Sequence, residues 1–347
     1  MMNKSIIIAL GGNALSPKEE AGTIYQQFAH TRESIDNIMH FVDLEYNICL
    51  THGNGPQVGD ELYRMELTHE TIPPLPLGVC VAETQGAIGY MVQQSLQNVL
   101  KEKKIDREVV TLITQTIVDK DDPSIHDPQK FIGRRYEEEE AKHLAKQFGW
   151  NVKEQEPGSW RQVVPSPMPQ FIEHGRSIQT LVDNGTIVIA SGGGGIPTFW
   201  NNKDKLEGLN AVVDKDLSAA LLGRVIKANE LWIITDLDQV CLNFGKPDEE
   251  PLLEMTFDQA KKYLNEGHFQ AGSMGPKIQS ALYFLNHHGE KVVITSIAGV
   301  LGAISGSTGT TITKRIIKGE KSEKKIYFVK HILSYERFCS RRFSIYF

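Results

Sequence analysis

Lysine side chains lie beside acidic and glycine-rich segments at two places in the second half of the chain. Lys215 stands between Asp214 and Asp216, and Lys277 follows the glycine-rich segment 272–275, where a helix is expected to begin. Phosphoryl transfer requires positive charge around the migrating PO3 group and little covalent chemistry from the protein. An isolated lysine is usually a solvated surface residue, but lysines in these positions favour a phosphoryl-transfer site.

Two further candidate cations, Lys130 and Arg161, fall in a stretch of different composition, residues 119–169. This stretch contains several prolines and the acidic run Glu137–Glu140, and it interrupts the rhythm of the chain. We expect it to leave the central sheet as a small protruding subdomain, a lid that carries Lys130 to the site. A static surface insertion explains the composition equally well.

Four glycine clusters provide candidate binding loops. In open α/β sheets, ligands bind at the carboxyl ends of the strands, where helix N-termini also favour anions. None of the clusters matches the P-loop or the dinucleotide-binding pattern, so we expect a phosphate site of another kind, with the clusters following strands. The clusters are Gly11-Gly12-Asn13, Gly53-Asn54-Gly55, Gly192–Gly195 and Gly272-Ser273-Met274-Gly275.

Short apolar runs alternate with segments of helical periodicity. Ile88, Val92 and Leu96, for example, recur at the spacing of one buried helix face. Such alternation predicts an α/β fold, with helices on both faces of a mainly parallel central sheet, which is a three-layer sandwich. The expected strands lie near residues 5–10, 46–51, 109–118, 186–190, 231–235, 292–295 and 310–313.

The composition excludes several functional classes. The net charge of −6 argues against a nucleic-acid surface, and no apolar run approaches the roughly 20 residues of a membrane span. An acidic chain must bind anionic substrates through a local cluster of cations and N–H groups. The four cysteines, Cys49, Cys80, Cys241 and Cys339, are widely spaced. We interpret them as reduced packing residues of a cytoplasmic protein.

A series of motifs runs in one order from about Ser5 to Thr313. The motifs are Ala9–Asn13, Thr51–Gly59, Thr84–Tyr90, Val163–Pro167, Gly192–Pro197, Val213–Asp216, Asn243–Asp248, Gly267–Phe269 and Gly272–Lys277. Together they resemble carbamate kinase, which implies the amino-acid-kinase fold and reversible phosphoryl transfer between ATP and carbamate. The resemblance also implies a homodimer, Mg²⁺ carried with ATP or ADP, and flux toward ATP during breakdown of arginine- or purine-derived carbamoyl phosphate.

The resemblance further implies an N-terminal lobe, 1–207, that binds carbamate or carbamoyl phosphate, and a nucleotide-binding C-terminal lobe, 208–313. By position, it assigns as catalytic residues Lys130, Lys215, Asp216 and Lys277. It assigns to substrate and phosphate binding Gly11, Gly12, Asn13, Gly53, Asn54, Gly55, Arg161, Gly193 and Gly194. It assigns to nucleotide binding Asp214, Asp236, Phe244, Lys246, Pro247, Gly272 and Met274.

One position narrows the choice within the superfamily. Related kinases such as acetylglutamate kinase carry a lysine where this chain has Ala9. The transition-state charge must then be neutralised from elsewhere, and Lys130 and Lys215 are the natural replacements. A non-catalytic nucleotide-sensing dimer is the alternative from another class, and the retained lysines argue against it.

Two features depart from the resemblance. The segment 157–159 reads Pro-Gly-Ser where the family commonly has Gly-Arg-Gly, so a paralogue that phosphorylates another small acid stays open as an alternative. Residues 314–347 hold ten Lys/Arg against three Glu. We expect this basic tail to be a disordered or non-native extension, with a segment for an anionic partner as the alternative.

Overall fold

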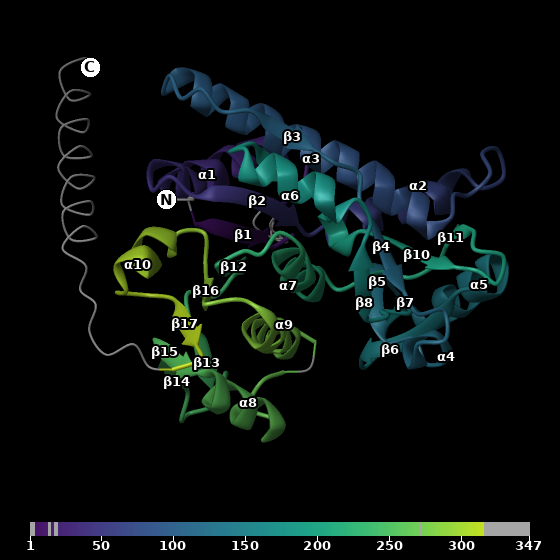
Figure 1. Cartoon of the computed structure of the whole chain (residues 1–347). Helices are drawn as coiled ribbons and strands as arrows, with labels where there is room; N and C mark the ends of the chain where they lie inside the picture. The colour runs from purple at the N-terminus through teal and green to yellow at the C-terminus, as the bar shows by residue number, and fades with distance from the viewer. Residues whose placement is uncertain (1–3, 13–14, 17–19, 271, 316–347) are drawn as a thin grey trace, which may run out of the picture.

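The fold centres on a sheet of eight strands (Figure 1). The structure is a computed structural model that describes residues 4–12, 15–16, 20–270 and 272–315. The strand order is β15-β17-β16-β12-β1-β2-β9-β3, and the described pairs are parallel except β16 with β17. The strands are β1 (Ser5–Leu10), β2 (Asn47–His52), β3 (Val109–Thr111), β9 (Ile187–Ile189), β12 (Glu230–Ile234), β15 (Glu254–Thr256), β16 (Lys291–Thr295) and β17 (Thr310–Thr313).

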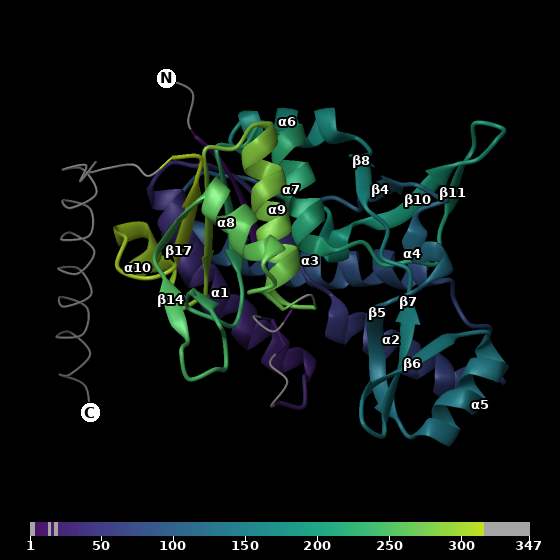
Figure 2. The ribbon, with the colours of Figure 1, turned by 90° about the horizontal axis from the view of Figure 1, so that it is seen from below.

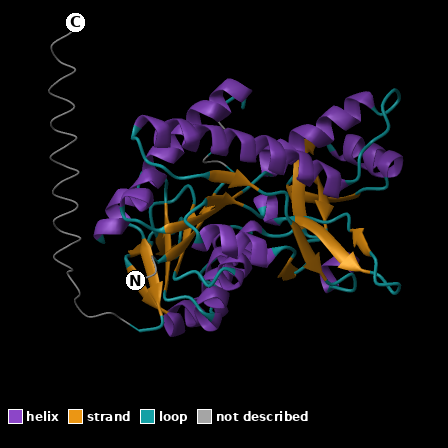
Figure 3. Ribbon diagram, turned by 45° about the horizontal axis from the view of Figure 1, so that its top comes forward, coloured by secondary structure: helices purple, strands orange, loops and turns teal. Residues whose placement is uncertain are grey.

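Helices cover both faces because the central strands are apolar on both sides. Ile6 and Ile8 of β1 pack into one layer, and Ile7 and Ala9 pack into the other. The first layer consists of α1 (Ile24–Asp43), α3 (Leu77–Glu102) and α10 (Val300–Ser305). The second consists of α6 (Gly175–Asp183), α7 (Lys215–Val225), α8 (Phe257–Asn265) and α9 (Met274–His287). Figures 2 and 3 show these helices around the strands, and the expected three-layer α/β sandwich is confirmed.

The segment of the chain between β4 (Gln115–Val118) and β8 (Pro169–Ile172) forms a small unit that protrudes beside the sheet (Figure 1). Its strands form an antiparallel sheet in the order β5-β7-β6, and α5 packs on it. It rests on α2 (Gly55–Thr68) through an apolar cluster that includes Leu62 and Ile132. Its elements are α4 (Pro123–His126), β5 (Lys130–Tyr136), α5 (Glu138–Phe148), β6 (Asn151–Glu156) and β7 (Ser159–Val164).

Two smaller sheets complete the fold. One has the order β11-β10-β4-β8, and the other is the hairpin β13-β14. A single 3-10 turn, η1 (Gly192–Gly194), follows β9. The strands of the two sheets are β4 (Gln115–Val118), β8 (Pro169–Ile172), β10 (Ile196–Trp200), β11 (Leu206–Gly208), β13 (Val240–Leu242) and β14 (Glu250–Leu252).

Two expectations about the elements are wrong. The run 109–118 forms two strands in two sheets, and between them the side chain of Gln85 bonds the N–H and the carbonyl oxygen of Thr114 at 2.8 and 3.2 Å. The cluster at Gly272 follows a helix, α8, and not a strand. It therefore lies in the connection between the helices α8 and α9.

Within the described ranges, none of the helices combines the length and the apolar character needed to cross a membrane. The division into lobes near residue 208 stays a prediction, since one sheet runs through both parts of the chain. The expected disordered tail, 314–347, lies outside the described residues from residue 316 onward.

Candidate active site

A cavity of about 640 Å³ opens at the carboxyl ends of the central strands. The loops that line it include Gly11 and Gly12 after β1, Gly53 after β2, and Thr235 and Asp236 after β12. The helices α2, α7 and α9 all begin at this cavity. Helix N-termini favour negative charge, so this edge suits an anionic ligand.

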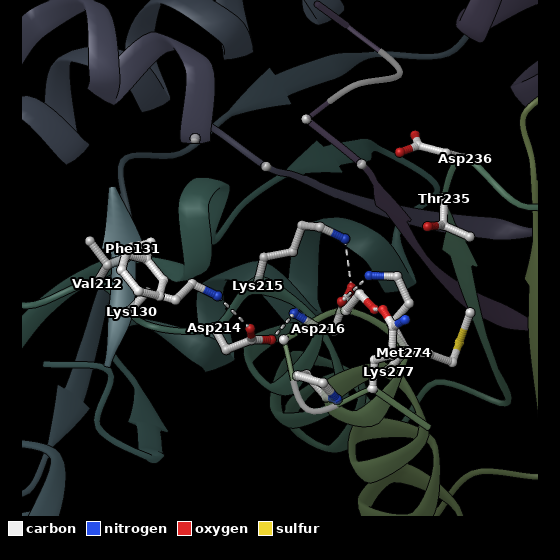
Figure 4. Close-up of a pocket in the computed structure, with 18 of the residues that line it drawn as sticks. Lys130, Phe131, Val212, Asp214, Lys215, Asp216, Thr235, Asp236, Met274 and Lys277 are labelled. Carbon is white, nitrogen blue, oxygen red and sulfur yellow. Dashed lines mark hydrogen bonds and ion pairs between the residues drawn. The ribbon is translucent and has the colours of Figure 1, made fainter. Parts of the chain in front are cut away.

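Two lysines share one carboxylate at the centre of the cavity (Figure 4). Lys215 Nζ lies 2.5 Å from Asp216 Oδ1, and Lys277 Nζ lies 2.9 Å from Asp216 Oδ2. Lys215 and Asp216 open α7, and Lys277 lies in the first turn of the neighbouring helix α9. The packing of these two helices therefore brings the three side chains together, and two positive charges face one negative charge.

Burial and ion pairing set the protonation states of this group. Burial by itself would raise the pKa of the Asp216 carboxyl, but Lys215 and Lys277 outweigh it and hold that pKa well below its ordinary value. Asp216 likewise outweighs the effect of burial on Lys277 and raises the pKa of that lysine. For Lys215, burial and the nearby charge of Lys277 together lower the pKa more than the aspartates raise it. A phosphate beside Lys215 would therefore favour its charged form.

Lys130 reaches the cavity from the protruding subdomain. Its Nζ lies 3.0 Å from Asp214 Oδ2, and its side chain is 38% exposed. Asp214 is the N-cap of α7 and accepts a bond from the N–H of Asp216 at 2.9 Å. In Figure 4, Lys130 and Met274 lie on opposite sides of the cavity, with Lys215 between them. Three elements thus bring three ammonium groups to one cavity.

Arg161 lines the cavity from β7. It donates from Nη2 to the carbonyl oxygen of Gly133 at 2.7 Å and from Nη1 to Gln155 Oε1 at 3.1 Å. Its buried Nε–H has no acceptor among the described residues. The departure at 157–159 falls at the turn between β6 and β7, where Gly158 has φ 77°. The arginine that the family commonly carries there is thus missing from the turn beside Arg161.

The glycine clusters approach one another too closely for side chains. A Cβ at Gly53 would lie 2.8 Å from the backbone nitrogen of Gly12, and one at Gly193 would lie 2.2 Å from Asn54 Nδ2. Asn54 itself is held by a 3.0 Å hydrogen bond to Thr84 Oγ1. The loops after β1, β2 and β9 therefore form one continuous floor.

Three expected site residues do not line the cavity. Lys246 and Pro247 are exposed in the turn between β13 and β14. Gly194 instead packs against the chain before α7, where a Cβ would lie 2.4 Å from the carbonyl oxygen of Val213. Asn13 lies outside the described residues. Besides the four catalytic candidates, the expected residues that line the cavity are Gly11, Gly12, Gly53, Asn54, Gly55, Arg161, Gly193, Asp214, Asp236, Phe244, Gly272 and Met274.

Several residues at or beneath the cavity had no predicted role in the site. Cys241, interpreted as a packing residue, is half-buried and lines it, as do Thr235 and His268. His52, the last residue of β2, is buried beneath the floor and donates from Nδ1 to the carbonyl oxygen of Gly53 at 3.0 Å. Burial lowers the pKa of His52 to about 4. Sequence reasoning could have found His52 and Thr235 from their positions at the ends of predicted strands, where ligands bind in such sheets.

The carboxylates of the cavity are poorly arranged for a metal ion held by protein alone. Among the described residues, no group of three or more His, Cys, Asp or Glu side chains could hold one. Asp214 and Asp216 both pair with lysines. Mg²⁺ commonly binds through phosphates, waters and one or two carboxylates. The site therefore fits Mg²⁺ that arrives on nucleotide phosphates.

The fold and the cationic cavity define a class of phosphoryl-transfer proteins. The model of the amino acid kinase family matches residues 4–296, and the chain belongs to that family.

Similar proteins show to which group within the amino acid kinase family the chain belongs. Carbamate kinase from Thermococcus kodakarensis is 44% identical and is matched over 90% of this chain and 99% of its own. Carbamate kinase from Pyrococcus furiosus is 42% identical over the same shares. The structure of carbamate kinase from Giardia lamblia bound to AMP-PNP matches 90% of this chain and 99% of its own, with TM-score 0.84 and 39% identity. The chain belongs to the carbamate kinases.

Proposed function

We propose that this chain transfers a phosphoryl group reversibly between ATP and carbamate and forms ATP from ADP and carbamoyl phosphate in the cell. The observation that carries the proposal is the convergence of Lys130, Lys215 and Lys277 on a cavity with a glycine-loop floor. Relatives named carbamate kinase, matched over nearly their whole length, support the same substrates.

In the mechanism, the chain supplies positioning and charge. The loops at Gly11 and Gly53 bind carbamoyl phosphate, and the loops around Phe244 and Met274 bind ADP. The bond from phosphorus to the carbamate oxygen breaks as a bond to the terminal oxygen of ADP forms, and carbamate leaves as an anion. No general base is needed because the attacking oxygen is already anionic. The lysines stabilise the charge on the transferring group.

Mg²⁺ belongs to the proposal as part of the nucleotide complex. When bound, it neutralises charge on the phosphate oxygens. Asp236 is a carboxylate of the cavity that would hold its water shell. The proposal also includes a homodimer, a cytoplasmic location and a role in the breakdown of arginine- or purine-derived carbamoyl phosphate.

A coupled assay tests the proposal directly. Purified protein with ADP, Mg²⁺ and carbamoyl phosphate should form ATP, and omission of carbamoyl phosphate or Mg²⁺ should abolish the signal. Acetyl phosphate and N-acetylglutamyl phosphate serve as alternative donors. ATP formation with one of these but not with carbamoyl phosphate would favour the paralogue acting on another small acid. Nucleotide binding without turnover on any donor would favour a sensor.

A further inference from the structure

The strand β5 carries Lys130 at the end nearest the cavity, and its other end contacts α2. Lys130 begins β5 and Tyr136 ends it. The hydroxyl of Tyr136 donates to Glu66 Oε1, and Arg134 Nε lies 3.3 Å from Glu66 Oε2. The Glu66 side chain is only 5% exposed and Tyr136 is buried, whereas Arg134 is 40% exposed, so the carboxylate lies beneath an arginine that faces solvent. We call Glu66, Arg134 and Tyr136 the latch.

Arg134 makes further contacts around the latch. Its guanidinium lies over the rings of Tyr63 and Tyr136, 4.7 and 4.5 Å from their centroids. Its Nη2 also donates to Glu140 Oε1 at 2.6 Å. Partly buried pairs with several partners hold geometry better than exposed single ion pairs. The latch therefore fixes the far end of β5 relative to α2.

Between the latch and the cavity, α2 and β5 remain in contact. A Cβ at Gly59 would lie 3.5 Å from Gly133 Cα, and Leu62 packs with Ile132. Gly133 has φ 68° and lies where the pairing of β5 with β7 shifts register. The helix itself begins at Gly55, which lines the cavity. Both elements thus run from the cavity to the latch as one unit.

We propose that Glu66 is a positioning residue for phosphoryl transfer and acts through β5 on Lys130. The inference rests on the proposed function, which gives Lys130 its role in the reaction. Lys130 is a long, part-exposed side chain, so the placement of its backbone decides how often its ammonium group occupies the transfer site. On this proposal, a closing motion of residues 119–169 either carries α2 along or breaks the latch.

Kinetics distinguish this positioning role from ordinary stabilisation. Tyr136→Phe and Glu66→Gln should each lower kcat by about tenfold while KM for ADP changes less, since small misplacements of a catalytic group are costly. In a Lys130→Ala background, the same changes should lower kcat by less than about twofold, because the group that they position is gone. Arg135→Gln is the matched control, since Arg135 lies on the same strand and pairs instead with exposed Glu156 at 2.8 Å.

An equal loss of kcat in both backgrounds, or no loss in either, would overturn the inference. So would a Lys130→Ala variant with full activity. Amide exchange gives a second test that needs no turnover. Tyr136→Phe should speed exchange at residues 130–132 as well as at 134–136, and a change confined to 134–136 would refute the link. A wild-type chain that forms no ATP would sink the proposed function alone, and exchange would still decide whether the latch acts on Lys130.

Discussion

At the scale of the residue, Asp216 controls how the cavity presents positive charge. It is nearly buried and holds Lys215 and Lys277 by opposite oxygens. Without this carboxylate, two like charges would face each other in a site from which water is largely excluded. The arrangement keeps both ammonium groups at fixed places with a net positive charge, which a transferring phosphoryl group can then use.

Replacement of either lysine tests this role. Lys277→Ala and Lys215→Ala should each lower kcat by roughly a hundredfold, by analogy with the loss of one preorganised donor, and weaken ADP binding less. Steady-state assays and separate ADP titrations measure the two effects. Lys262→Ala is the matched control, because the Lys262 side chain of α8 is exposed. Near-full turnover of Lys277→Ala would show that this lysine only begins a helix.

His52 predicts a pH dependence of stability. Burial lowers its pKa from 6.5 to about 4, so between these values the unfolded chain binds a proton that the folded chain does not. The free energy of unfolding should therefore fall as the pH falls through this window, by about 3 kcal/mol from this group. Denaturant unfolding at several pH values should show a shallower slope for His52→Gln. An identical slope would mean that His52 is protonated in the folded protein.

The sequence predicted the cationic residues and the aspartates that pair with them, but it missed other polar groups of the cavity. Lys215 and Lys277 could be predicted because they lie beside acidic or glycine-rich segments, and Lys130 because it lies in the stretch 119–169 of different composition. His52 and Cys241 do not, since a histidine at the end of a strand and an isolated cysteine are common packing residues. Lys246 was predicted from the resemblance alone, and it is exposed in the turn between β13 and β14 and does not line the cavity. Its contact with nucleotide stays a prediction.

At the scale of the element, apolar runs located the central strands because these strands are buried on both faces. The same signal failed at residues 109–118, where the apolar pattern continues across a change of sheet. At the change of sheet, the backbone of Thr114 bonds Gln85 of the preceding helix α3, a pairing that no local pattern reveals. Local composition thus predicts which residues form strands, but it does not predict to which sheet each strand belongs.

The floor of the cavity offers a test of how tightly the loops pack. Gly53→Ala would place a Cβ 2.8 Å from the nitrogen of Gly12, whereas Gly55→Ala meets nothing within 4 Å. We expect Gly53→Ala to lower the free energy of unfolding by about 1–3 kcal/mol, the usual cost of overpacking. Gly55→Ala should change it far less. Urea titrations of both variants decide, and equal values would show that the loops after β1 and β2 can separate freely.

At the scale of the whole molecule, the described sheet is complete at β17. This strand pairs with β16 and β15, and Thr313 Oγ1 donates to the carbonyl oxygen of Arg315 at 2.7 Å. A chain that ends after Arg315 should therefore keep its fold and its ATP-forming activity within about twofold. Circular dichroism melts and the coupled assay measure both. An insoluble or inactive truncated chain would show that residues 316–347 are required.

The order of the strands also constrains how the chain can be made. β1 lies in the middle of the sheet and pairs with β2 on one side and β12 on the other. β2 follows it early in synthesis, but β12 begins only at Glu230. Until β12 has been made, the apolar strand β1 has one edge open to other chains. Protection of the nascent chain, by chaperones or by rapid translation of the middle segment, is therefore a requirement of this topology.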